Sequence, residues 1–362
     1  MTKLFPARVD PAAAGKETLA IVSRPDAEAL VPPGHRFDLV YPATWRSPYP
    51  DGNIYSAAFE SATIDWLGRF GLVTDERDLE TVRKFSCGRY GGYSSPRSSF
   101  RDGLLLTQYV SLWLFWDDRV VEEGLGWSVN DIVAALVEPQ VPDAADGFAR
   151  AWHDLCVRLR RTQSDRWLLR LAIDMEAWMR NAKLETANAA RYQSSGELPD
   201  FEALLAIRTI SIGMYPTFHL IEMAEGLELP DGFHDDPFVR ELKRLASALV
   251  GYGNDLGGFA KDCLATWPNL VTAMKEQADL GTVDAFRAVV NLHNADVQAF
   301  DEVARQLPTW GAQSDVQVSG WVQAVRYSIV GFTLWESVAE RYQQVQAVVD
   351  GRVLTAPVMF ED

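Results

Sequence analysis

Residues 104–123 read LLLTQYVSLWLFWDDRVVEE, an apolar run that ends in a cluster of carboxylates. From Leu104 to Trp116 nearly every face of a helix would be apolar. Such a helix is stable only when it is buried on most of its sides. The run therefore predicts a core helix of a large domain.

The carboxylates that follow this run are Asp117, Asp118 and, one turn later, Glu122. Neighbouring carboxylates at the end of a buried helix repel one another and resist desolvation, so they need cations nearby. Two interpretations stay open. The acidic end reaches solvent where a core helix surfaces, or it is a site for a hard cation such as Mg²⁺, which takes oxygen ligands and leaves room for phosphate and water.

Helical periodicity extends from this run in both directions. From Ile54 onward apolar residues recur at spacings of three and four, with turn signals between them and no alternating segment that carries hairpin chemistry. We expect a single all-α bundle of about 10–12 helices over residues 54–362. The helical windows are about 54–70, 76–88, 98–123, 128–138, 143–162, 165–187, 200–225, 236–264, 268–279, 283–306 and 315–349.

Residues 1–53 differ from the rest of the chain, because they hold eight of the 18 prolines and show little periodicity. We expect an irregular N-terminal segment that packs on the helical domain and is not a domain of its own. The sequence after residue 53 has no internal repeat and no interior linker that would justify a further division.

Composition and charge exclude several classes of protein. Of the 362 residues, 48% are hydrophobic and 23% are charged, which is typical of a globular protein with a large core and excludes a disordered chain. The 34 Lys and Arg against 50 Asp and Glu give a net charge of −16. This charge would repel a phosphate backbone, so nucleic acid is not an expected partner.

The cysteines, histidines and N-terminus restrict the class further. The three cysteines are far apart and form no C-x-x-C pair, which fits a reducing, cytoplasmic compartment. The five histidines are at least fifteen residues apart, so we expect no local histidine zinc motif. The first residues lack an apolar signal region, and 104–116 is too short to span a bilayer, so we expect no stable membrane insertion.

A second unusual segment, residues 250–262, reads VGYGNDLGGFAKD. Its four glycines each cost a helix about 0.8 to 1 kcal/mol relative to alanine, so something other than helix propensity selects them. Asn254, Gly258 and Asp262 are spaced at i, i+4 and i+8 and would form one oxygen-bearing face. The alternative is a close helix crossing, with Asn254 as a hydrogen-bonded core residue.

Two further segments combine charge with apolar surroundings. Gly213 and Pro216 should break the helix that contains Arg208, because proline leaves the carbonyl of residue 212 without its amide partner. Arg208 is either a surface residue with a buried stem or a diphosphate ligand. Arg341 and Tyr342 end the last predicted helix, a pair that is common on any helix end.

These four segments, in this order and spacing, resemble the bacterial class I terpene cyclases. Residues 117–122 (DDRVVE) fit the family's aspartate-rich motif, and residues 254–262 (NDLGGFAKD) fit its metal-binding pattern (N/D)Dxx(S/T)xxx(E/D). Arg208 matches the family's diphosphate-sensing arginine, Arg341 and Tyr342 match its Arg-Tyr pair, and residues 66–73 (WLGRFGLV) resemble its RFGL stretch.

The resemblance covers about Phe37 to Tyr342 and contains two departures. Gly258 replaces the Ser or Thr whose hydroxyl binds Mg²⁺ in most relatives, and Asp262 replaces the usual Glu. A water could take the place of the missing hydroxyl, because Mg²⁺ commonly keeps several waters.

The resemblance implies a helical bundle around a central cavity in which an isoprenyl diphosphate is ionised with the help of three Mg²⁺. It implies metal ligation by Asp117, Asp118, Glu122, Asn254, Asp262 and a water at Gly258. It implies diphosphate binding by Arg208, Lys261, Arg341 and Tyr342. It implies a water-excluding pocket lined by Trp113, Leu114 and Trp335, with a carbonyl near Gly213 directed at the developing charge.

Three alternatives to this function are open. A chain-elongating prenyltransferase would carry two DDxxD-type motifs, whereas the second site here begins with Asn254. A non-catalytic helical scaffold would leave the glycine-rich segment unexplained. Among cyclases we expect farnesyl diphosphate and a sesquiterpene product, with geranylgeranyl diphosphate and a diterpene as the alternative. A homodimer is compatible with the family.

Overall fold

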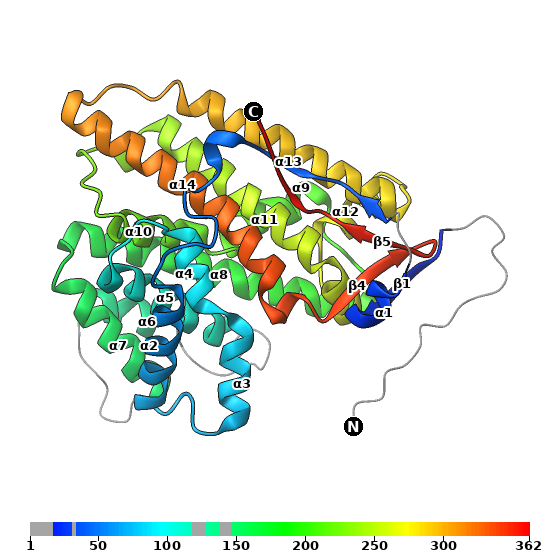
Figure 1. The fold of residues 1–362 in the computed structure, drawn as a ribbon, viewed down its shortest axis with the longest axis horizontal. Coiled ribbons are helices and arrows are strands. Elements are labelled where there is room, and N and C mark those ends of the chain that lie inside the picture. Colours follow the sequence, from blue (N-terminus) through cyan, green and yellow to red (C-terminus); the bar gives the residue numbers. More distant parts are fainter. Residues whose placement is uncertain (1–16, 31–33, 118–127, 138–145) are drawn as a thin grey trace.

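Helices make up most of the structure, a computed structural model that describes residues 17–30, 34–117, 128–137 and 146–362 (Figure 1). The α-helices are α1 (Arg24–Glu28), α2 (Ser56–Arg69), α3 (Glu76–Phe85), α4 (Cys87–Ser94), α5 (Phe100–Trp116), α6 (Val129–Val137), α7 (Gly147–Arg160), α8 (Asp165–Ser195), α9 (Phe201–Ser211), α10 (Met214–Ala224), α11 (Pro237–Ala265), α12 (Leu270–Gln277), α13 (Thr282–Ala304) and α14 (Ala312–Val338). Short 3₁₀ helices are η1 (Ala43–Trp45), η3 (Phe233–Asp235) and η4 (Glu340–Tyr342).

Each predicted helical window contains at least one of these helices, and the all-α prediction is confirmed. Four windows differ clearly from the prediction. The window 165–187 is too short, because α8 continues to Ser195. The window 76–88 divides into α3 and α4 at Ser86, which has a left-handed backbone with φ of 50°. The window 200–225 divides at Gly213, as Gly213 and Pro216 predicted. The window 315–349 is too long, because α14 ends at Val338.

Local signals explain the two helices that carry the principal motifs. Ser99 caps α5 by accepting a hydrogen bond from the amide of Asp102, and most of the following residues are buried. Asp236 caps α11 by accepting from the amides of Phe238 and Val239. Helix α11 then continues without a break through its four glycines, since packing on α13, α9 and α14 outweighs their low helix propensity.

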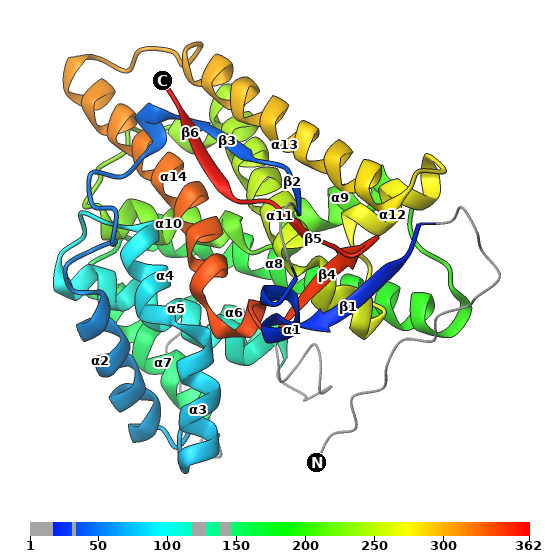
Figure 2. The same cartoon turned by 45° about the vertical axis from the view of Figure 1, so that its right-hand side comes forward.

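Both ends of the chain form strands that the sequence analysis did not predict. The strands are β1 (Leu19–Ser23), β2 (His35–Arg36), β3 (Leu39–Pro42), β4 (Val345–Val349), β5 (Arg352–Thr355) and β6 (Val358–Glu361). Strand β4 pairs antiparallel with β1 and β5, whereas β2 pairs parallel with β5 and β3 with β6. The N-terminal and C-terminal segments therefore lie side by side along α11 and α14 (Figure 2).

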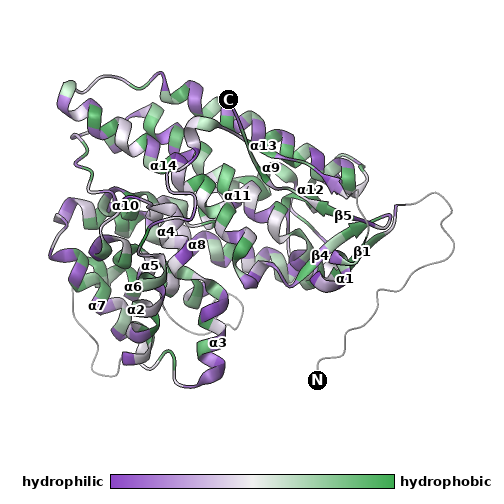
Figure 3. Ribbon diagram, viewed as in Figure 1, coloured by the Kyte–Doolittle hydropathy of each residue, from purple (hydrophilic) through white to green (hydrophobic). Residues whose placement is uncertain are grey.

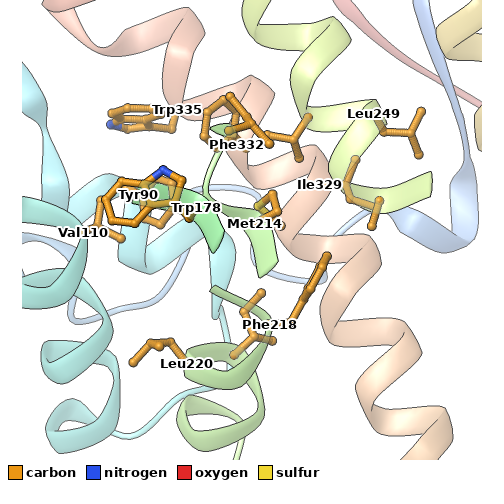
Figure 4. Close-up of a cluster of buried hydrophobic side chains, with 14 of the residues drawn as sticks. Tyr90, Val110, Trp178, Met214, Phe218, Leu220, Leu249, Ile329, Phe332 and Trp335 are labelled. Atoms are coloured by element: carbon orange, nitrogen blue, oxygen red, sulfur yellow. The ribbon is translucent and has the colours of Figure 1, made fainter. Parts of the chain in front are cut away.

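Aromatic side chains fill the core where α4 and α14 meet (Figure 4). The ring of Tyr90 lies edge-on to Trp335 at 5.2 Å between centroids and to Phe332 at 5.9 Å. Gly331 permits this approach, because a Cβ at that position would lie 2.6 Å from the carbonyl oxygen of Tyr93. Hydrophilic residues gather on outer helices such as α3 (Figure 3).

One described helical stretch, Phe201–Ala224, is long and apolar enough by composition to cross a membrane, with a mean hydropathy of 1.3. Within the protein, 67% of its most apolar window is buried, and Gly213 interrupts it between α9 and α10. These two properties are typical of a core helix.

Candidate active site

The predicted motifs from α5, α9, α11 and η4 meet around one cavity of about 120 Å³. Ten of the predicted site residues line it, namely Trp113, Leu114, Asp117, Arg208, Asn254, Gly258, Lys261, Asp262, Arg341 and Tyr342. Asp118 and Glu122 lie outside the described residues. Gly213 lies just behind the cavity wall, and Trp335 is not part of the wall.

Arg208 lies between three helices at the polar end of the cavity. Its Nε donates to Oδ1 of Asp255 at 2.8 Å, its Nη1 donates to Oε1 of Glu185 at 3.3 Å, and its Nη2 donates to Oδ1 of Asn254. The side chain is only 15% exposed, so the surface interpretation of Arg208 is wrong. Burial acts to lower the pKa of Arg208, but Asp255 and Glu185 outweigh it and raise that pKa above its ordinary value.

Asn254, Gly258 and Asp262 line the cavity together, on one face of α11. The amide Nδ2 of Asn254 donates to Oε1 of Glu336, and Oδ2 of Asp262 accepts from Nδ2 of Asn269 at 2.8 Å. Burial raises the pKa of Asp262 to about 7 and that of Glu336 to about 8. Carboxylates gathered in this way favour a bound cation, which would lower both pKa values.

The glycines of α11 serve two different purposes. A Cβ at Gly253 would lie 3.3 Å from Oγ1 of Thr333, and one at Gly251 would lie 3.4 Å from Cγ of Arg208. These two glycines thus let α14 and the arginine approach α11. A Cβ at Gly258 or Gly257 would meet only carboxylate oxygens, at 3.4 Å from Asp262 and 3.6 Å from Glu336. Close helix crossing therefore does not explain Gly257 and Gly258.

Asp117 and Arg341 lie next to each other in the cavity wall. Asp117 is the C-cap of α5, and its Oδ2 lies 3.7 Å from Nη2 of Arg341 in η4. The guanidinium of Arg341 also lies over the ring of Phe85, 5.8 Å from its centroid. Tyr342 packs edge-on against Trp335, at 5.4 Å between centroids, and burial raises the pKa of its phenol.

The break between α9 and α10 leaves one backbone carbonyl at the cavity wall. The Ser211 carbonyl accepts from Nε1 of Trp178 at 2.9 Å, and the Gly213 carbonyl accepts from Oγ1 of Thr217 at 2.8 Å. Ile212 lines the cavity, and no donor among the described residues reaches its carbonyl, since Pro216 has no amide hydrogen. The free carbonyl expected near Gly213 is thus that of Ile212.

The predicted orientation of Trp335 is wrong. Its indole Nε1 donates to the Phe85 carbonyl at 2.7 Å, and its ring is fully buried against Tyr90 and Phe332 (Figure 4). Phe332, three residues earlier on α14, lines the cavity instead. Trp335 therefore supports the aromatic wall from behind and does not form it.

Two acidic residues near the cavity were missed by the sequence analysis. Glu185 of α8 lines the cavity and accepts from Arg208 and from the Ser211 hydroxyl. Glu336 of α14 accepts a hydrogen bond from the Asn254 amide nitrogen, whereas Arg208 donates to the oxygen of the same amide. Glu336 had a detectable signal, because it is a charged residue at the end of the apolar stretch 328–336. Glu185 had none, since a single glutamate between Leu184 and Thr186 is ordinary on a helix.

The donor atoms at the polar end of the cavity fit a hard divalent cation. Among the described residues that line the cavity, every ligand-type side chain presents oxygen and none presents sulfur or imidazole nitrogen. Asp117, Asn254 and Asp262 supply two carboxylates and an amide carbonyl, the ligand types that Mg²⁺ takes. Arg208, Lys261 and Arg341 add positive charge beside them, as binding of an anionic diphosphate requires.

A second cluster of ligand-type side chains lies away from the cavity. His219 and Glu222 of α10 and His234 of η3 bring ligand atoms within 4.8 Å of one another, although the two histidines are fifteen residues apart in sequence. Histidine spacing along the sequence does not reveal this cluster, because its residues come together only in the fold. Lys243 Nζ lies 2.9 Å from Nδ1 of His234, and Arg170 Nη2 lies 3.4 Å from Oε1 of Glu222. We interpret the cluster as a buried network of paired charges.

The fold and the cavity together define a metal-dependent enzyme of the all-helical class that acts on diphosphates. The family model for terpene synthase family 2, C-terminal metal binding, matches residues 108–299. The chain belongs to this family and is a bacterial class I terpene synthase, an enzyme that cyclises isoprenyl diphosphates.

Relatives along almost the whole chain agree with this assignment. The (+)-T-muurolol synthase of Roseiflexus castenholzii, which cyclises (2E,6E)-farnesyl diphosphate, is 27% identical over 85% of this chain and 94% of its own. Sesquiterpene synthase 6 of Postia placenta is 30% identical over 80% of this chain and 86% of its own. The crystal structure of a-eudesmol synthase shares the fold, with a TM-score of 0.71, 18% identity and coverage of 80% of this chain and 96% of its own.

Proposed function

We propose that this chain is a Mg²⁺-dependent sesquiterpene cyclase that takes farnesyl diphosphate and releases diphosphate and a cyclic product. The observation that carries the proposal is the polarity of the cavity. Its wall has a polar part, made of carboxylates and guanidinium groups, and an apolar part that includes Trp113, Leu114 and Phe332. A prenyl diphosphate likewise combines a charged head with an apolar chain.

The polar end holds the head group. Asp117 on one side and Asn254 with Asp262 on the other would hold Mg²⁺, with a water beside Gly258 in place of the missing hydroxyl. Asp118 and Glu122 would support Asp117. Bound Mg²⁺ supplies the positive charge that stabilises the departing diphosphate.

Cationic side chains bind the diphosphate directly. Arg208, Lys261, Arg341 and the Tyr342 hydroxyl line the same end of the cavity and can donate hydrogen bonds to phosphate oxygens. Arg341 is held over Phe85 and faces Asp117, so it is placed before substrate arrives. These groups favour departure of the anion because they strengthen as its negative charge grows.

The apolar end protects the carbocation that remains. The faces of Trp113 and Phe332 carry negative quadrupole potential, which stabilises a nearby cation without bonding to it. The unpaired Ile212 carbonyl adds a dipole at the wall. Because Trp113, Leu114 and Phe332 offer no strong hydrogen-bond acceptor, this part of the wall disfavours water that would quench the cation.

The substrate length is tested by one incubation series. Purified protein is supplied with C10, C15 and C20 prenyl diphosphates, with Mg²⁺ or with EDTA, and the extracts are analysed by gas chromatography with mass spectrometry. We expect a cyclic C15 hydrocarbon or alcohol only with Mg²⁺. The farnesyl-cyclising relative supports C15. A cyclic product from geranylgeranyl diphosphate alone would replace the C15 assignment with a diterpene cyclase.

The cellular setting is part of the same proposal. Cys87, Cys156 and Cys263 are all free, which fits a reducing cytoplasm. Light scattering on the purified protein tests whether it forms the homodimer that the family allows.

A further inference from the structure

A buried glutamate of α14 holds the amide of Asn254 from behind. Helices α11 and α14 lie side by side (Figures 1 and 2). Glu336 is only 3% exposed, and its Oε1 accepts a hydrogen bond from Nδ2 of Asn254. On the other side of the same amide, Oδ1 of Asn254 accepts from Nη2 of Arg208. Both ends of this side chain therefore have a hydrogen-bond partner.

These two partners permit only one orientation of the amide. A bound divalent cation favours the ionised form of Glu336, which can only accept hydrogen bonds, whereas a guanidinium can only donate them. If the Asn254 amide turned over, its NH₂ would face the guanidinium of Arg208 and its oxygen would face the carboxylate of Glu336. Two favourable contacts would become two unfavourable ones, and leaving such groups unpaired in a buried site is costly. Glu336 thus directs Oδ1 toward the cavity.

The same contact discriminates between asparagine and aspartate at position 254. An aspartate there would place a second carboxylate against Glu336, near the further carboxylates of Asp255 and Asp262. When a bound cation keeps Glu336 ionised, the two like charges would destabilise each other in this buried site, so Glu336 favours the amide over a carboxylate at position 254.

We propose that Glu336 is a positioning residue that orients the Asn254 carbonyl oxygen toward the bound divalent cation and thereby requires asparagine at position 254. The inference rests on the proposed function, in which Asn254 is a metal ligand. Its importance follows from Gly258, because a site that lacks one side-chain hydroxyl depends more on the remaining oxygens.

The test measures metal binding and not turnover. Mn²⁺ is titrated into the full-length protein in the presence of inorganic pyrophosphate, and free Mn²⁺ is counted by electron paramagnetic resonance. Glu336→Leu removes the acceptor and is expected to weaken Mn²⁺ binding about tenfold. Glu336→Gln keeps a carbonyl acceptor and is expected to stay within about threefold of the wild type. Glu302→Gln, on the exposed side of α13, is the charge-matched control and should bind as the wild type does.

A reciprocal pair of substitutions keeps the inference testable if Glu336→Leu fails to fold. Asn254→Asp alone should weaken Mn²⁺ binding about tenfold, because two carboxylates then oppose each other. The double variant Asn254→Asp/Glu336→Gln restores a donor and an acceptor with their positions exchanged, so its Mn²⁺ affinity should recover to within about threefold of the wild type. A merely structural role for Glu336 would not produce this recovery.

The outcomes separate the inference from the proposed function. Wild-type affinity in a folded Glu336→Leu variant, or a double variant no better than Asn254→Asp, overturns the positioning role while Mg²⁺-dependent product formation by the wild type still supports the cyclase. A wild type that neither binds Mn²⁺ nor forms product overturns both.

Discussion

Arg208 donates its Nε hydrogen to Oδ1 of Asp255 across 2.8 Å, so α9 and α11 are joined by an ion pair at the polar end of the cavity. The other oxygen of Asp255 accepts from the backbone amide of Leu270 at 2.8 Å, which fixes the carboxylate to the start of α12. Asp255 thus acts as a fixed support for the guanidinium. Arg208 is placed by protein groups alone, before any diphosphate is bound.

Arg208→Ala should both destabilise the protein and abolish turnover. It leaves Asp255 and Glu185 buried without their cation, and breaking a buried pair in this way costs about 3–5 kcal/mol. Urea denaturation measures the loss of stability, and a diphosphate-release assay measures turnover. Arg180→Ala is the control, since the Arg180–Glu176 pair is exposed and its loss should cost less than about 1 kcal/mol. Equal stability of the two variants would contradict the buried-support role.

Gly213→Ala should destabilise the protein more than a glycine substitution at matched backbone geometry. Both Gly213 and Gly232 have φ of 80°, but a Cβ at Gly213 would lie 3.1 Å from the Trp113 ring, whereas one at Gly232 would meet nothing within 4 Å. Gly232→Ala should therefore cost about 1 kcal/mol and Gly213→Ala at least about 1 kcal/mol more. Thermal denaturation of the two variants compares them, and identical melting temperatures would exclude contact with Trp113 as a cause.

Gly258→Ser should be tolerated and should raise Mg²⁺ affinity. The added Cβ meets only the Asp262 carboxylate at 3.4 Å, and the hydroxyl would add a further oxygen ligand of the kind that Mg²⁺ takes. Turnover is measured against Mg²⁺ concentration, with a lower half-saturating concentration expected. Gly331→Ser is the opposite case, because its Cβ would lie 2.6 Å from the Tyr93 carbonyl oxygen and should destabilise the protein by about 1–3 kcal/mol. Unfolding of the Gly258→Ser variant would show that position 258 is sterically closed.

Lys243 should make the free energy of unfolding depend on pH in the alkaline range. Its buried ammonium faces Arg170 and His234 as well as Asp174 and Glu222, and burial lowers its pKa from 10.5 to about 8. Between these values the unfolded chain holds a proton that the folded protein has lost. The free energy of unfolding therefore rises with pH across this window, by at most about 3 kcal/mol.

The Lys243→Met variant isolates this contribution. Chemical denaturation of both proteins from pH 7.5 to 10.5 gives the difference in their free energies of unfolding. We expect this difference to move in favour of the wild type as pH rises, because only the wild type carries the titrating ammonium. A difference that stays constant over the whole range would mean that Lys243 is not charged differently in the folded and unfolded states.

Helices of this fold could be predicted from the sequence because burial imposes a period on them. Leu104–Trp116 is apolar on nearly every face, and the structure buries most of α5 accordingly. The strands could not be predicted in the same way, since each is only two to five residues long. One signal was nevertheless present in the sequence, namely the Asp350-Gly351 dipeptide, which is typical of a two-residue hairpin turn. In the structure both residues have positive φ and form the turn between β4 and β5.

The candidate site could be predicted where one helix carries it and not where several helices meet. Asn254 and Asp262 share a face of α11 through their spacing alone. Glu336 becomes their neighbour only because α14 packs beside α11, and the orientation of Trp335 depends on the Phe85 carbonyl that its indole finds across the core. Contacts between elements distant in sequence leave no local pattern to detect.

The pairing of β1 with β4 links the N-terminal segment to the part of the chain that carries Arg341 and Tyr342. Strand β4 begins three residues after Tyr342, and it is paired with β1 from Leu19↔Val349 to Ser23↔Val345. Arg24 adds a hydrogen bond to the side chain of Gln343 at 2.9 Å. A shortened chain without β1 would keep every cavity residue, but β4 would lose the partner that holds it next to Arg341 and Tyr342. We therefore expect substitutions in β1, far from the cavity, to change how tightly Arg341 and Tyr342 bind the diphosphate.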